Sequence, residues 1–203
     1  MNEPHGAPTL HAMGGIPHTN SVLYVGACEH TFAEGFVGYW ILDQLPHAKF
    51  TVLEAFGPLI PHLKANEYVV DRDIEVVHGD VRHVDSVLAG RRFDATIWWH
   101  GPEHIERELL ESTLGCLEQM TRRYMILGCP MGESPQAPFC DAGELNPYEE
   151  HLTAIQPSDL AALGYSVLVI PRREQEPGMS AWKVLTSRHS KRIMKGTNAP
   201  IAR

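Results

Sequence analysis

The sequence predicts an α/β protein with a Rossmann-like, doubly wound sheet of about seven strands. The sheet is expected to be mostly parallel, with an antiparallel edge strand and helices on both faces. Short apolar runs alternate along the chain with segments of helical periodicity. Such runs, apolar on both faces, are typical of parallel strands covered by helices on both sides. The last two runs are joined by a short polar turn, which predicts an antiparallel hairpin at one edge.

Each element is predicted from its own local pattern. Strands are expected where short apolar runs end at glycine or a polar turn. Such runs lie at 21–26, 50–55, 74–80, 93–99, 123–128, 165–170 and 180–187. Helices are expected where apolar residues recur at i, i+4. This pattern lies at 31–45, in a proline-interrupted stretch ending near 70, and at 81–89, 103–120 and 157–163.

One domain accounts for most of the chain. Residues 1–20 are rich in glycine, proline and histidine and show no periodicity, so we expect a flexible N-terminal arm. Residues 21–187 form the predicted domain. Within it, 129–156 is expected to be a lid-like insertion, because long irregular loops are typically functional or disordered. Residues 188–203 are basic and are expected to form a solvated tail.

Charge and cysteine usage argue against several classes of function. The formal net charge is −8, and the acidic body argues against nucleic-acid binding. The four cysteines form no C-x-x-C pair, so they indicate neither a zinc site nor a redox motif, and a reducing cytoplasm fits. Neither a secretory signal nor an apolar run of about 18 residues is found, so we expect a cytoplasmic protein without membrane contact. The sequence leaves open a homodimer.

Three residues end three successive predicted strands: Gly26, Glu54 and Asp80. Ligands of doubly wound sheets bind beyond the carboxyl ends of the strands. A glycine there permits close approach of backbone to ligand, and Glu54 can accept both hydroxyl hydrogens of a ribose. Asp80 can accept a hydrogen bond from an adenine amine. Each residue alone also fits a simpler role, as a steric glycine, a surface acid or a helix N-cap. Together they predict an adenosine site.

These motifs resemble those of a known family. The runs VLYVGACEH, TVLEAF, VVHGDVR and FDATIWWHGPEHIE resemble motifs of class I S-adenosylmethionine (SAM)-dependent methyltransferases, over most of 21–187. CPMG, the N-P-Y-x-x-H element and DLAALGY are similar to bacterial members with a generic methyltransferase domain. The resemblance implies SAM as the cofactor, its methionine part near Gly26, its ribose on Glu54 and its adenine on Asp80. The cofactor-binding residues expected on this basis are Gly26, Ala27, Glu54, Ala55, Asp80, Val81 and Trp99.

Histidines supply the candidate catalytic groups. Methyl transfer needs mainly alignment, and a general base only where the nucleophile must lose a proton. His100 follows the fourth predicted strand, His104 opens the long predicted helix, and His151 is expected to turn inward from the insertion. For His104 and Glu103 the alternative is capping of that helix. No metal is predicted, because Gly101 and a proline separate the first two histidines and take them off one helical face.

The leading hypothesis is a SAM-dependent methyltransferase acting on a small-molecule or saccharide-like acceptor. Only the first glycine of the family's glycine-rich loop is present, since Cys28 and His30 occupy positions where glycine is usual. This departure motivates the alternative, a catalytically degenerate binding module with the same fold. An NAD-dependent oxidoreductase ranks last, because the turn after the first strand lacks the G-x-G-x-x-G pattern.

Overall fold

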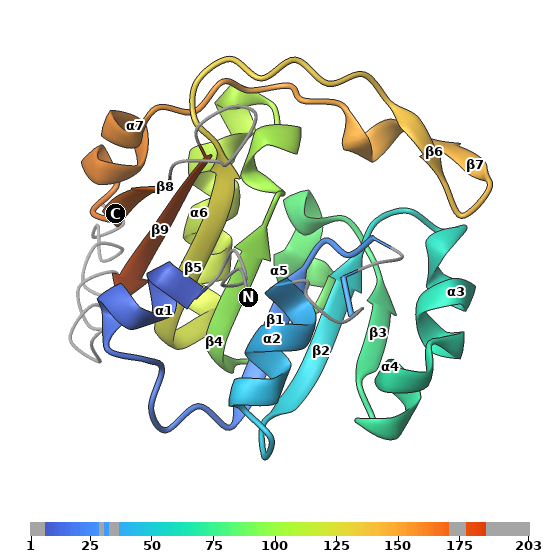
Figure 1. Cartoon of the computed structure of the whole chain (residues 1–203). Helices are drawn as coiled ribbons and strands as arrows, with labels where there is room; N and C mark the ends of the chain where they lie inside the picture. The colour runs from blue at the N-terminus through green and yellow to red at the C-terminus, as the bar shows by residue number, and fades with distance from the viewer. Residues whose placement is uncertain (1–6, 29–30, 33–36, 171–177, 186–203) are drawn as a thin grey trace, which may run out of the picture.

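A seven-stranded sheet forms the centre of the protein (Figure 1). The computed structural model describes residues 7–28, 31–32, 37–170 and 178–185. The strand order is β3-β2-β1-β4-β5-β9-β8. The strands of this sheet are β1 (Ser21–Val25), β2 (Lys49–Glu54), β3 (Glu75–His78), β4 (Phe93–Trp99), β5 (Thr121–Pro130), β8 (Ser166–Ile170) and β9 (Gly178–Val184).

Strand direction confirms the predicted doubly wound class. All neighbouring pairs from β3 to β5 are parallel. Strand β9 runs antiparallel to both β5 and β8. The predicted hairpin therefore lies at one edge, with its antiparallel strand one place in from the outermost strand.

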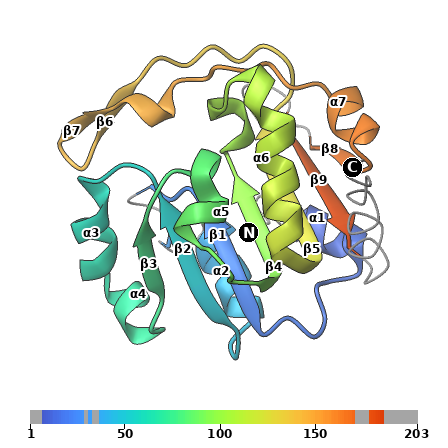
Figure 2. The ribbon, with the colours of Figure 1, turned by 180° about the vertical axis from the view of Figure 1, so that it is seen from behind.

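Helices cover both faces of the sheet, with α1 and α2 on one face and α5 and α6 on the other (Figures 1 and 2). The helices are α1 (Ala7–Met13), α2 (Val37–Gln44), α3 (Leu59–Ala65), α4 (Glu67–Asp71), α5 (Val84–Val87), α6 (Arg107–Met120) and α7 (Pro157–Ala162). Short 3-10 turns are η1 (Val81–His83), η2 (Pro102–His104) and η3 (Pro147–Glu149). Among the described helices, none has the length and apolar character needed to cross a membrane.

The core has two halves because side chains alternate along each strand. In β1, Leu23 and Val25 pack in the half that contains Leu114 of α6. Val22 and Tyr24 point the other way, into the half that contains residues of α1, α2 and α3. Strand β4 is buried along its whole length, since both faces are covered. Sheet and helices together hold the carboxyl ends of the strands in fixed positions.

The N-terminal segment differs from the predicted flexible arm. Residues 7–13 form α1, and Leu10 is buried in the core. The hydroxyl group of Thr9 donates a hydrogen bond to that of Ser180 in β9, and both side chains are fully buried. The apolar residues Leu10 and Met13 alone gave too weak a pattern to predict a helix. Packing against the rest of the protein stabilises this helix. Residues 1–6 and the predicted basic tail 188–203 lie outside the described residues.

Several other elements also differ from prediction. The helix predicted over 103–120 begins at Arg107, because Ile105 and Glu106 have extended backbone angles and η2 precedes them. Of the helix predicted over 31–45, residues 31–32 form a turn, residues 33–36 lie outside the described residues, and Val37–Gln44 form α2. The predicted insertion contains a small hairpin of β6 (Phe139–Asp141) and β7 (Glu144–Asn146), and β5 extends to Pro130. We refer to residues 131–156 as the β5–α7 connection.

Candidate functional site

A cavity of about 470 Å³ lies at the carboxyl ends of the central parallel strands. All seven residues predicted to bind a cofactor line it: Gly26, Ala27, Glu54, Ala55, Asp80, Val81 and Trp99. Of the predicted catalytic histidines, His100 and His104 line the cavity, whereas His151 does not. The β5–α7 connection contributes Phe139, Asn146, Tyr148 and Glu149. Strand ends and connection thus enclose one space.

Glu54 fixes the path of the turn after β1. Its carboxylate accepts hydrogen bonds from the N–H groups of Ala27 at 2.8 Å and Phe56 at 2.6 Å. Gly26 has a φ of +72°, a left-handed conformation that glycine adopts without strain. The N–H of Cys28 donates to the hydroxyl of Thr31 at 2.8 Å. The side chains of Glu54 and Thr31 therefore hold this loop, in which the glycines usual in the family are missing. Residues 29–30 lie outside the described residues.

Burial changes the ionisation of Glu54, which is only 6% exposed. Loss of solvation raises the pKa of its carboxyl group from 4.5 to about 7, against the lowering effect of the Ala27 and Phe56 N–H groups. The negative charges of Glu149 and Asp141 raise this pKa further. Glu54 thus changes charge near neutral pH at the edge of the cavity.

The raised pKa of Glu54 predicts a pH-dependent stability. A carboxyl group that binds its proton more tightly in the folded state stabilises folding at acid pH. This stabilisation is complete below about pH 4.5 and is lost as pH rises through about 7. We expect the free energy of unfolding of the wild type, relative to Glu54→Gln, to fall by about 3 kcal/mol over this range. Urea unfolding of both proteins across this range tests this, and a difference independent of pH would contradict it.

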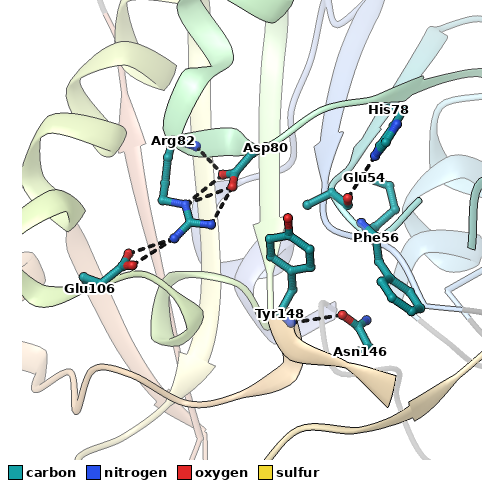
Figure 3. A network of polar contacts seen from close by, with 9 residues as sticks. Glu54, Phe56, His78, Asp80, Arg82, Glu106, Asn146 and Tyr148 are labelled. Atoms are coloured by element: carbon teal, nitrogen blue, oxygen red, sulfur yellow. Dashed lines mark hydrogen bonds and ion pairs between the residues drawn. The ribbon is translucent and has the colours of Figure 1, made fainter. Parts of the chain in front are cut away.

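Asp80 is held by an arginine that the sequence analysis did not single out (Figure 3). Its carboxylate accepts hydrogen bonds from the Arg82 guanidinium, the shortest at 2.6 Å, and from the Arg82 N–H at 2.8 Å. The Arg82 side chain also donates to Glu106 at 2.9 Å and lies 5.9 Å from the ring centre of Tyr148. Asp80 therefore caps η1, the simpler role considered for it, while still facing the cavity.

The bend after β4 places His100 at the cavity. His100 has a φ of +51°, unusual for a residue other than glycine, and its N–H donates to the Gly128 carbonyl at 2.7 Å. Such left-handed residues cluster at functional sites, where the surrounding structure holds them in place. The next residue, Gly101, packs directly on the buried indole of Trp98. The imidazole of His100 is half-exposed, with Nδ1 3.4 Å from the Glu103 carboxylate.

The imidazole of His104, which lines the cavity, contacts that of His151, which does not. Their ring centres are 4.9 Å apart, in an edge-on arrangement. Nε2 of His151 lies 4.0 Å from Oε1 of Glu103, and both residues line a second, smaller cavity of about 170 Å³. Glu103 does not cap α6. It lies in η2, and its carbonyl accepts hydrogen bonds from the N–H groups of Leu152 and Thr153.

Glu149 is a further cavity residue that the sequence analysis missed. Burial raises the pKa of its carboxyl group to about 7, and the charges of Asp141 and Glu103 add to this effect. Neither Glu149 nor Arg82 lies at a strand end, and sequence spacing carried no signal for their positions. The sequence carried one local signal for the Asp80–Arg82 ion pair, which is that the two residues lie only two positions apart.

The fold is similar to that of solved methyltransferases, whereas no family model and no curated protein matches the chain. The N-terminal domain of EvdMO1 with SAH (S-adenosylhomocysteine) bound is 16% identical, with 91% of this chain and 82% of that chain aligned and a TM-score of 0.60. The DhpI–SAM–HEP complex is 15% identical, with 88% and 85% aligned and a TM-score of 0.56. TehB from Haemophilus influenzae is 11% identical, with 92% and 64% aligned and a TM-score of 0.61.

These likenesses confirm the predicted fold, the Rossmann-like fold of class I SAM-dependent methyltransferases. The alignments cover 88–92% of this chain. At such low identity these likenesses show the fold alone. The ligand and the reaction must be argued from the residues of the cavity.

Proposed function

We propose that this protein is a SAM-dependent methyltransferase. The observation that carries the proposal is the convergence of Gly26, Glu54 and Asp80 on one cavity at the ends of three adjacent parallel strands. In this proposal Glu54 would accept hydrogen bonds from the ribose, Asp80 would accept one from the adenine amine, and the Gly26 turn would hold the methionine part. A cavity of about 470 Å³ is in the usual size range of small-molecule sites. The fold shared with SAM- and SAH-bound proteins supports the same reading.

The acceptor we propose is a small molecule, with a saccharide-like hydroxyl as the leading candidate. EvdMO1 was crystallised in the presence of SAH and D-fucose, and DhpI with SAM and HEP. In this chain His100 and His104 line the cavity and can act as general base toward an acceptor hydroxyl. We propose that the β5–α7 connection acts as the lid of this site, since four of its residues complete the cavity.

Calorimetric titration with SAH tests the cofactor assignment. We expect saturable binding of one SAH per chain, because the cavity offers a ribose acceptor and an adenine acceptor together. Transfer of a labelled methyl group from SAM to a panel of saccharides and other small hydroxyl compounds then tests the reaction. Absence of SAH binding at millimolar ligand would sink the proposal.

A second candidate is a binding module that holds the cofactor without turnover. Two observations favour it: both oxygens of Asp80 already accept hydrogen bonds from Arg82, and the loop after β1 lacks the usual glycines. Tight SAH binding combined with no methyl transfer to any acceptor in the panel would identify this case.

A further inference from the structure

A buried glutamate and two histidines from distant parts of the chain come together in the wall of the cavity. Glu103 and His104 belong to η2, and His151 belongs to the β5–α7 connection. One potential ligand atom from each of the three lies within 4.8 Å of the other two. An ion centred among them would be within reach of a carboxylate oxygen and two ring nitrogens.

The hydrogen bonds of the two imidazoles leave one nitrogen of each free to bind a metal. Nδ1 of His104 lies 3.0 Å from the carbonyl oxygen of Glu150, and Nδ1 of His151 hydrogen-bonds to that of Ser134. A carbonyl oxygen can only accept, so each Nδ1 must carry the proton and donate it. Each neutral ring then has its lone pair on Nε2. Metal-binding histidines are typically oriented in this way by a backbone carbonyl on the opposite nitrogen.

The carboxylate of Glu103 lacks the partners that its burial requires. The residue is 2% exposed, and among the described residues neither carboxylate oxygen has a hydrogen-bond partner. A buried carboxylate without hydrogen bonds carries a large desolvation cost, so such groups normally pair with a cation or bind a metal. The nearest cationic candidates are imidazole nitrogens of His100 and His151, at 3.4 and 4.0 Å.

We propose that Glu103, His104 and His151 form a binding site for a divalent transition-metal ion. Two imidazoles and one carboxylate suit Zn²⁺, Co²⁺ or Fe²⁺, whereas Mg²⁺ prefers oxygen ligands throughout. Three protein ligands leave a coordination position open, and the small cavity lined by Glu103 and His151 provides a path for the ion. The bound ion would tie the β5–α7 connection to η2. The site needs no bound cofactor, and it revises the expectation that no metal binds. Because the lone pair of His104 would bind the ion, it leaves His100 as the candidate general base in the cavity.

Titration of the full chain, freed of metal by chelation, tests the site with Zn²⁺ in calorimetry and Co²⁺ in visible absorption. We expect one tight site per chain, a Co²⁺ spectrum of low-coordinate nitrogen and oxygen ligation, and a higher melting temperature with Zn²⁺. Excess Mg²⁺ should not displace either ion. His104→Ala, His151→Ala and the isosteric Glu103→Gln should each weaken Zn²⁺ binding by at least about tenfold.

His47→Ala is the matched control, because His47 is an exposed histidine in a turn before β2. This variant removes only a surface imidazole, so it should bind Zn²⁺ at the tight site with the affinity of the wild type. The proposal is overturned if the three ligand variants bind Zn²⁺ as tightly as the wild type, or if Co²⁺ shows only the spectrum of the hydrated ion. Should one variant fail to fold, the remaining two decide the outcome.

Discussion

Glu54→Ala is expected to weaken SAH binding by about tenfold to a hundredfold. Hydrogen bonds to charged groups contribute about 1.5–3 kcal/mol each, and a factor of ten corresponds to about 1.4 kcal/mol. The proposed ribose would lose its acceptor. In addition, the N–H groups of Ala27 and Phe56 would lose the carboxylate that positions them. Calorimetric titration with SAH measures the change directly.

The matched control for this prediction is Glu108→Ala. Glu108 is an exposed carboxylate in the first turn of α6, away from the cavity. It should bind SAH as the wild type does. Circular dichroism establishes that both variants are folded at the temperature of the titration. If Glu54→Ala is folded and binds SAH with unchanged affinity, Glu54 does not hold the ribose.

Gly101→Ala is expected to lower the free energy of unfolding by about 3 kcal/mol or more. A Cβ atom at this position would lie 1.8 Å from Nε1 of Trp98, far inside van der Waals contact. The indole of Trp98 is buried in the core and cannot move without disturbing its neighbours. Overpacking of a dense core typically costs 1–3 kcal/mol, and a contact this short lies at the upper end. Because Trp98 lines the cavity, SAH binding should weaken as well.

Gly115→Ala makes the same glycine-to-alanine change but is expected to raise the free energy of unfolding. Gly115 lies within α6, and a Cβ added there would meet nothing within 4 Å. Alanine is favoured over glycine in a helix by about 1 kcal/mol, so this variant should be slightly more stable than the wild type. Urea unfolding of the two variants compares them. Equal stability of Gly101→Ala and the wild type would show that the β4–η2 bend is not tightly packed.

The fold was predictable because its signals are local and repeated. Each strand of the sheet was expected from its own apolar run, and the parallel order follows from the alternation of strands and helices. Helix α1 was missed because its residues Thr9 and Leu10 are buried against residues far away in sequence. The β6–β7 hairpin was missed because its strands are short and mostly exposed, so they lack a periodic apolar pattern.

The cavity was predictable only in the part built from strand ends. Parallel strands bring Gly26, Glu54 and Asp80 to one edge whatever their other contacts are. The meeting of Glu103 with His151, 48 positions apart in the sequence, depends on the path of the β5–α7 connection, which periodicity does not describe. The orientation of the Arg82 side chain toward both Asp80 and Glu106 is likewise a property of the packed structure.

Arg82 contacts residues on both sides of the cavity. Its guanidinium is shared among Asp80 in the turn after β3, Glu106 before α6 and the ring of Tyr148 in the β5–α7 connection. A ligand amine that takes an oxygen of Asp80 competes with this cation, and the freed guanidinium changes its contact with Tyr148. Coupling between two binding sites is reciprocal. Under the proposed assignment of adenine to Asp80, a ligand bound at Tyr148 would therefore change adenine affinity by the factor by which adenine changes the affinity of that ligand. With the proposed cofactor bound, its occupancy and the position of the β5–α7 connection would be parts of one equilibrium.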